Sequence, residues 1–253
     1  MVTLSNYGYG AKFIEDSFNL GGRRNQSNTA CPSYNCGGFA LGTFSWYVPF
    51  AEDMLDYAVE VGAIKERHIE EILEGTSEDD YYWEEQDFLE NYRLPRYNLN
   101  NRSMNCLLNY KSWSSIQICK NLEAIYPNLF ERNSMFLDYF GRKIVTENKG
   151  VRPITALSEL RLNEYCIAFR IGDGDFHFLR SNDAQCQLWI EKRGTTKILC
   201  HHAGEIKYPV GSEKFFDTLF KTRIHFYNSK TLLFAKRNGG KYEDIISDRY
   251  GRR

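Results

Sequence analysis

Residues 165–180 read YCIAFRIGDGDFHFLR, two runs of β-branched, aromatic and other apolar residues on either side of GDGD. β-Branched and aromatic side chains favour strands, and glycine beside aspartate favours a tight hairpin turn. The stretch therefore predicts two antiparallel strands. A third strand is predicted after the loop SNDAQ, in CQLWIEK at 186–192.

The segments on both sides extend this pattern. Toward the C-terminus, RIHFYNSKTLLFAKR at 223–237 predicts another hairpin, turning at Asn228-Ser229, and 237–253 predicts a polar tail. Toward the N-terminus, apolar residues at helical spacing run from Cys36 to about residue 140, and they are clearest at 50–63, 64–75, 76–92 and 114–126. Helices first, followed by an antiparallel sheet after about residue 160, predict an α+β fold.

Composition and charge limit the classes of function. The chain has 253 residues, of which 42% are hydrophobic, and a formal net charge of −1. So small a charge gives no bulk attraction to nucleic acid or to a membrane surface, and we expect neither as a partner. No apolar run reaches the roughly 18 residues that span a bilayer, and the N-terminus has no signal-peptide pattern. Seven scattered cysteines, an odd number, favour a reduced, cytoplasmic setting.

SYNCGGFALGTF, at 33–44, is the first candidate for chemistry. One interpretation is the start of a buried helix in which two glycines allow tight packing. In the other, Cys36 is a nucleophile on the first turn of a helix capped by Asn35, where the helix N-terminus favours a thiolate. The backbone N–H of Cys36 would then stabilise an oxyanion, and Gly37 and Gly38 would let a substrate approach closely.

A thiol nucleophile needs a base, and the chain has five histidines: His68, His177, His201, His202 and His225. His68 lies among charged residues and is expected to be solvated. His201 and His202 follow a predicted strand and are expected to form a loop pair, and His225 alternates within a strand. His177 lies mid-strand, between Phe176 and Phe178, so it shares the opposite face with Leu179. We therefore expect His177 to be the base, unless it is simply a half-buried core histidine.

The next predicted strand supplies an acid. A loop centred near Ala184 would put Leu179 opposite Trp189 and His177 opposite Glu191. Glu191 would then accept a hydrogen bond from one ring nitrogen and orient the other toward Cys36. The inference depends on register, because a one-residue slip would move Glu191 to the other face.

NCGGFAL, DFHFLR and the following Trp189, Lys192 and Gly194 resemble the papain-like cysteine peptidases, closest to their NlpC and CHAP branches and to uncharacterised bacterial and phage proteins of that type. The resemblance covers residues 36–41 and about 164–194. It implies one papain-like domain over 1–253, with the nucleophile helix packed on the C-terminal antiparallel sheet and a helical insert at 50–140. Asn35 replaces the usual aspartate, and Glu191 stands where NlpC-type enzymes often have His or Asn.

Other candidate sites are weaker. Cys31 and Cys36 with Cys200 and His201 or His202 have no zinc-knuckle spacing. GDGD is too short for a calcium loop, and GGRRNQSN lacks the lysine of a P-loop. The acidic, aromatic run at 78–90 predicts an amphipathic helix, or a docking surface for a basic partner. We therefore expect no metal and no cofactor.

The expected function is a thiol hydrolase that cleaves an amide or isopeptide bond in a protein or peptide, with Cys36, His177 and Glu191 as nucleophile, base and orienting acid. The same residues would also serve deamidation or acyl transfer. The alternative is a non-catalytic papain-like protein, such as a phage or mobile-element factor that binds a host protein. Thiol reactivity separates the two, because an enzyme should have a single fast-reacting cysteine.

Overall fold

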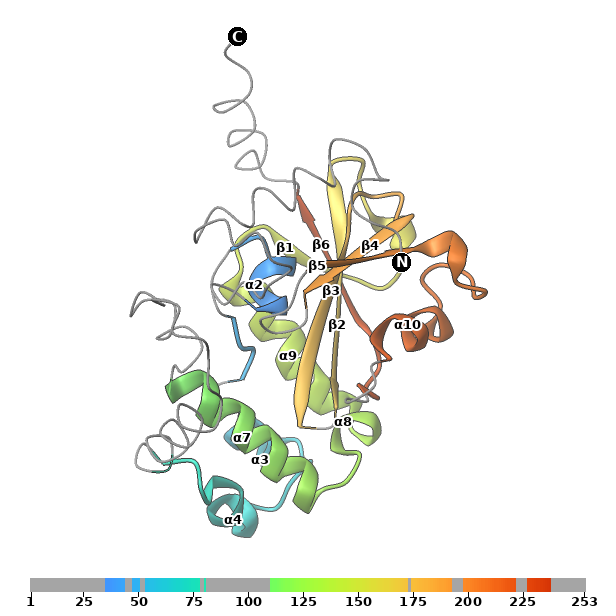
Figure 1. Ribbon diagram of the computed structural model, residues 1–253. Helices are drawn as coiled ribbons and strands as arrows, with labels where there is room; N and C mark the ends of the chain where they lie inside the picture. Colours follow the sequence, from blue (N-terminus) through green and yellow to red (C-terminus); the bar gives the residue numbers. More distant parts are fainter. Residues whose placement is uncertain are drawn as a thin grey trace, which may run out of the picture.

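The computed structural model describes residues 35–43, 47–50, 53–77, 80, 110–172, 174–192, 198–221 and 227–237. Within these residues the chain forms helices and an antiparallel sheet of six strands in the order β1-β6-β2-β3-β4-β5, so the α+β class is confirmed (Figure 1). Most of the helix predicted at 76–92, the N-terminal loop, Cys31, Cys106, His225 and the polar tail beyond residue 237 lie outside the described residues.

The strands occupy the C-terminal part of the chain, as the alternating sequence pattern predicts. Their bounds are β1 (Val151–Ile154), β2 (Glu164–Gly172), β3 (Asp175–Ser181), β4 (Leu188–Lys192), β5 (Ile198–His202) and β6 (Leu232–Arg237). The sheet thus begins somewhat before the predicted residue 160. Gly172 pairs with Asp175 across the β2–β3 hairpin, and Gly174 in the turn has a positive φ of 66°, which confirms the tight turn at GDGD.

The hairpin predicted at 223–237 is wrong. β6 forms as expected, but β1 occupies one of its edges and β2 the other. A strand has only two edges, so β6 is not the second arm of a two-stranded hairpin, and residues 223–226 of the predicted first arm lie outside the described residues. Ser229 bonds to β2 instead: its N–H donates to the carbonyl of Ile171 at 3.1 Å, and its Oγ accepts from the Ile171 N–H at 3.0 Å.

The longer helices lie mostly before the sheet. The helical elements are α2 (Cys36–Ala40), α3 (Asp53–Glu60), η3 (Glu66–His68), α4 (Ile69–Leu73), α7 (Tyr110–Ile125), α8 (Leu129–Arg132), α9 (Ser134–Glu147), η4 (Leu157–Glu159), η5 (Ala203–Glu205) and α10 (Glu213–Phe220). Helix α10 was not expected within the strand-rich part. Ser212 caps it by accepting from the Phe215 N–H at 3.2 Å. None of the described helices is long and apolar enough to cross a membrane.

The two faces of the sheet carry separate hydrophobic clusters. One face packs Ile167, Phe169, Phe176 and Phe178 against α2, α3 and α7 to α9. The other packs Cys166, Ala168, Leu179 and Trp189 against α10 and its neighbours. Figure 1 shows α2 and α9 on one side of the sheet and α10 on the other. Both faces are covered, so consecutive residues of β2 are buried throughout its length.

Candidate active site

Cys36 is the first residue of α2, as the sequence predicts, and Asn35 fixes that position. The Asn35 Oδ1 atom accepts from the Gly38 N–H at 3.0 Å and from the Tyr47 N–H at 3.1 Å, while Nδ2 donates to the Tyr47 carbonyl at 2.7 Å. The amide thus caps the helix and ties it to the segment at Tyr47. Asn35 therefore acts as a structural clamp.

Tyr47 also explains the first glycine of NCGG. A Cβ atom on Gly37 would lie 2.9 Å from the Tyr47 carbonyl oxygen and 2.9 Å from its ring carbon Cδ1. The absent side chain therefore makes room for Tyr47, and Tyr47 in turn packs edge-on against Phe178 with ring centroids 6.0 Å apart. At Gly37 the close approach is that of the protein itself, so the expectation that this glycine admits a substrate is wrong.

His177 lies in the middle of β3, on the face opposite Phe176 and Phe178. Its ring stacks on Tyr227, with centroids 5.5 Å apart, and meets Phe220 of α10 edge-on at 6.0 Å. The side chain is almost completely buried, with 2% of the residue exposed. These aromatic walls leave the ring little freedom to rotate, so its nitrogens have fixed directions.

Glu191 contacts His177 as predicted, although the predicted register is wrong. Leu179 lies opposite Glu191, and Ser181 lies opposite Trp189. The loop keeps two more residues on the β4 side than expected, with Cys186 at a positive φ of 54°. The pairing moves by two residues, an even number, so Glu191 stays on the face of His177. Its Oε2 atom lies 2.6 Å from Nε2 of His177, on the diagonal between the strands.

Cys36 interacts with His177 although α2 packs on the other face of the sheet. β3 pairs with β4 only from Leu179 to Ser181. His177 comes before this paired segment, at a part of β3 that has no β4 residue directly opposite. Helix α2 contacts both strands. Burial acts to lower the pKa of His177, but hydrogen bonding and charge from Cys36 and Glu191 outweigh it and raise the pKa to about 10. The raised pKa favours the charged form of the His177 ring, the form that would stabilise a thiolate beside it.

The structure thus brings together the three residues that the sequence predicts. Only 4% of Cys36 is exposed, and Glu191 is fully buried. Charges in so dry a site interact strongly, because little water screens them. The arrangement supplies a thiol on a helix N-terminus, an imidazole beside it and a carboxylate that holds the imidazole, which is the chemistry of nucleophilic acyl transfer.

Sequence reasoning missed a further member of this cluster. His201, expected in a loop, lies on β5 opposite Trp189, and its Nε2 atom is 2.7 Å from Oε1 of Glu191. Its side chain is 29% exposed, whereas the Glu191 side chain is inaccessible. Alternation along β5 could have placed His201 on the face of Glu191, but only with the β4–β5 register known.

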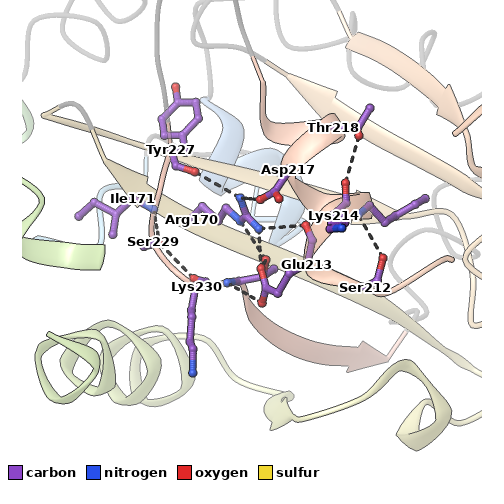
Figure 2. Close-up of polar contacts among 12 residues, drawn as sticks. Arg170, Ile171, Ser212, Glu213, Lys214, Asp217, Thr218, Tyr227, Ser229 and Lys230 are labelled. Carbon is purple, nitrogen blue, oxygen red and sulfur yellow. Dashed lines mark hydrogen bonds and ion pairs between the residues drawn. The ribbon is translucent and has the colours of Figure 1, made fainter. Parts of the chain in front are cut away.

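A network of ion pairs around Arg170 supports the segment whose Tyr227 ring stacks on His177 (Figure 2). Arg170 of β2 is buried, and it binds Glu213 Oε2 at 2.5 Å and Asp217 Oδ1 at 2.7 Å, both on α10. It also donates to the Tyr227 carbonyl at 3.4 Å. Through these contacts Arg170 joins α10 to the segment that carries Tyr227, the ring that stacks on His177.

No group of three or more His, Cys, Asp or Glu side chains is arranged to hold a metal ion in the part of the chain that the structure describes. Comparisons of the chain with protein-family models, with curated proteins and with solved structures found no match.

Proposed function

We propose that this chain is a papain-like thiol hydrolase that cleaves an amide or isopeptide bond in a protein or peptide. The observation that carries the proposal is the 2.6 Å contact between the His177 ring and the Glu191 carboxylate, with Cys36 near enough to the ring to raise its pKa. Three residue types in these roles, joined in this order, are the requirement for an activated thiol.

In the proposed reaction, the Cys36 thiolate attacks the carbonyl carbon and the imidazolium of His177 protonates the leaving amine. A thioester remains on Cys36. Neutral His177 then takes a proton from water, the resulting hydroxide attacks the thioester, and the carboxylic acid leaves as the proton returns to the sulfur. The Cys36 N–H stabilises the oxyanion in both steps, because the first residue of a helix has no intrahelical acceptor. Glu191 keeps the ring oriented throughout.

A non-catalytic interaction protein on the same scaffold is the second candidate, and one observation favours it. Cys36 is 4% exposed, so a substrate carbonyl reaches the sulfur only after covering groups move. A hydrolase requires that movement, whereas a binding protein does not.

The test is hydrolysis of a complex peptide library, with new termini mapped by mass spectrometry. We expect cleavage by the wild-type protein, loss of cleavage in Cys36→Ala and His177→Ala, and unchanged cleavage in Cys200→Ala, a half-buried thiol outside the site. Cleavage that persists in Cys36→Ala would overturn the proposal. Absence of any cleavage, together with a Cys36 no more reactive than Cys200, would favour the binding protein.

A further inference from the structure

We propose that His201 is a positioning residue of this site, which pins the second oxygen of Glu191 and connects the buried Cys36–His177–Glu191 series to solvent. The inference rests on the proposed function only for its catalytic consequence. The contacts that carry it are independent of any substrate.

The Glu191 carboxylate is held at both ends. Oε2 contacts Nε2 of His177 at 2.6 Å, and Oε1 contacts Nε2 of His201 at 2.7 Å. An ionised carboxylate only accepts hydrogen bonds, so both Nε2 atoms carry protons. His177 is left with Nδ1 as the nitrogen for the Cys36 thiol. A carboxylate with one of these contacts could rotate about its last torsion, whereas two contacts fix its plane.

His201 also reduces the cost of burying Glu191. The carboxylate is fully buried, and a buried oxygen without a donor costs more than the hydrogen bond itself contributes. The opposing strands give a reason for the choice of residue: β5 places His201 across from Trp189, on the diagonal to Glu191, and leaves part of its ring in solvent. His201 can therefore exchange protons with water while the rest of the cluster cannot.

The charged groups around this cluster include a buried cation: Arg170 of β2 lies directly opposite His177 and binds the carboxylates of α10. β3 contributes His177, β4 contributes Glu191, and α2 contributes Cys36. Tyr227 stacks on His177 and donates its hydroxyl to Asp175 Oδ2 at 3.0 Å, and α10 contributes the uncharged ring of Phe220. Alternation along the strands places Lys192 and Arg180 on the other face, where Arg180 lies over the Tyr165 ring at 3.8 Å.

The consequence is a shared carboxylate. Both imidazoles donate to Glu191, so losing the His201 contact changes how firmly Glu191 holds the N–H of His177. The reactivity of Cys36 should therefore depend on the donor at position 201.

Two variants separate positioning from charge. His201→Gln keeps an N–H donor for Glu191 but cannot titrate, and His201→Phe removes the donor. The readouts are the NMR titration of the His177 ring and the rate of Cys36 alkylation by iodoacetamide. We expect His201→Phe to slow alkylation near neutral pH about tenfold, the value of one hydrogen bond to a charged group. His201→Gln should stay within about threefold of wild type, because it keeps a donor for Glu191.

Equal behaviour of both variants and the wild type would overturn the proposal. An equal fall in both variants, with the melting temperature lowered alike, would also overturn it in favour of a purely structural role. Should His201→Phe fail to fold, the wild-type protein decides, because the NMR signal of the His201 Nε2 proton must be that of a hydrogen-bonded proton. Neither readout uses a hydrolysed substrate, so the coupling can hold in a protein that cleaves nothing, and hydrolysis can hold without the coupling.

Discussion

Oε2 of Glu191 lies 2.6 Å from Nε2 of His177, and this contact sets the tautomer of a ring that is almost completely buried. The nitrogen bonded to a carboxylate carries the proton, which directs Nδ1 toward Cys36. The same carboxylate accepts from His201 on the next strand. Substitutions at this point therefore change the electrostatics of three residues at once.

Glu191→Gln is expected to harm the site more than the loss of charge alone would. The glutamine amide has one acceptor oxygen, so its NH₂ must face the N–H of either His177 or His201. We expect a loss of about 1–3 kcal/mol in the free energy of unfolding and about tenfold slower alkylation of Cys36. Urea denaturation and alkylation kinetics measure the two effects. A variant as stable and as reactive as wild type would show that Glu191 is protonated in the folded protein.

Cys36 is expected to be the fastest-reacting thiol among the described cysteines. Burial raises the pKa of Cys119 and Cys166 well above the ordinary range and that of Cys186 to about 11, so these remain thiols near neutral pH. Mass-spectrometric mapping after brief exposure to iodoacetamide at pH 6 should find Cys36 modified first. His177→Ala should remove most of this advantage. Equal labelling of Cys36 and Cys200 in the wild type would contradict the thiolate–imidazolium pair.

The pH dependence of stability should report the His177 proton. The pKa of this ring is about 10 in the folded protein and about 6.5 in an unfolded chain, so its contribution is complete below pH 6.5 and is lost as the pH rises toward 10. The stability difference between the wild type and His177→Phe should therefore shrink over that window. Thermal melts at half-unit pH steps measure it. A difference that stays constant from pH 6 to pH 10 would mean that His177 is neutral when folded.

The Arg170 network should respond asymmetrically to substitution. The Arg170 side chain is 4% exposed, whereas those of Glu213 and Asp217 are 56% and 60% exposed. Removing both carboxylates leaves a buried guanidinium without a counter-charge. We therefore expect Glu213→Gln with Asp217→Asn to lower the free energy of unfolding by roughly 3 kcal/mol. Arg170→Met leaves two carboxylates that are already exposed to water, so it should lower the free energy of unfolding by less. Urea denaturation compares them, and the reverse order would place the guanidinium in contact with solvent.

Gly37→Ala tests the clamp between α2 and Tyr47. The added Cβ meets a backbone oxygen at 2.9 Å. Overpacking of this kind costs roughly 1–3 kcal/mol, which outweighs the gain of about 1 kcal/mol in helix propensity. We therefore expect a lower free energy of unfolding. Gly141→Ala in α9 is the matched control, since the nearest atom lies 3.9 Å from its Cβ and the same gain should appear unopposed. A stabilised Gly37→Ala protein would show that Tyr47 does not press on the helix.

Local patterns predicted the parts of the fold that depend on neighbours in sequence. The β2–β3 hairpin, the start of α2 at Cys36 and the face of His177 follow from turn residues, caps and alternation. The position of β6 between β1 and β2 depends on contacts between residues far apart in the chain, and no local pattern encodes it. His201 was missed for the same reason. The predicted β3–β4 register was wrong by two residues, yet Glu191 still contacts His177 because strand faces repeat every two residues.

The location of β6 has a consequence for the order in which the protein matures. β6 is the last described strand in the chain and lies between β1 and β2, so β1 has no partner in the sheet until residues 232–237 have been synthesised. Closure of the sheet therefore depends on residues that are synthesised after Cys36, His177 and Glu191. A chain truncated before β6 would carry these three residues without the complete sheet between β1 and β2, so their alignment is expected to form only after β6 has been added.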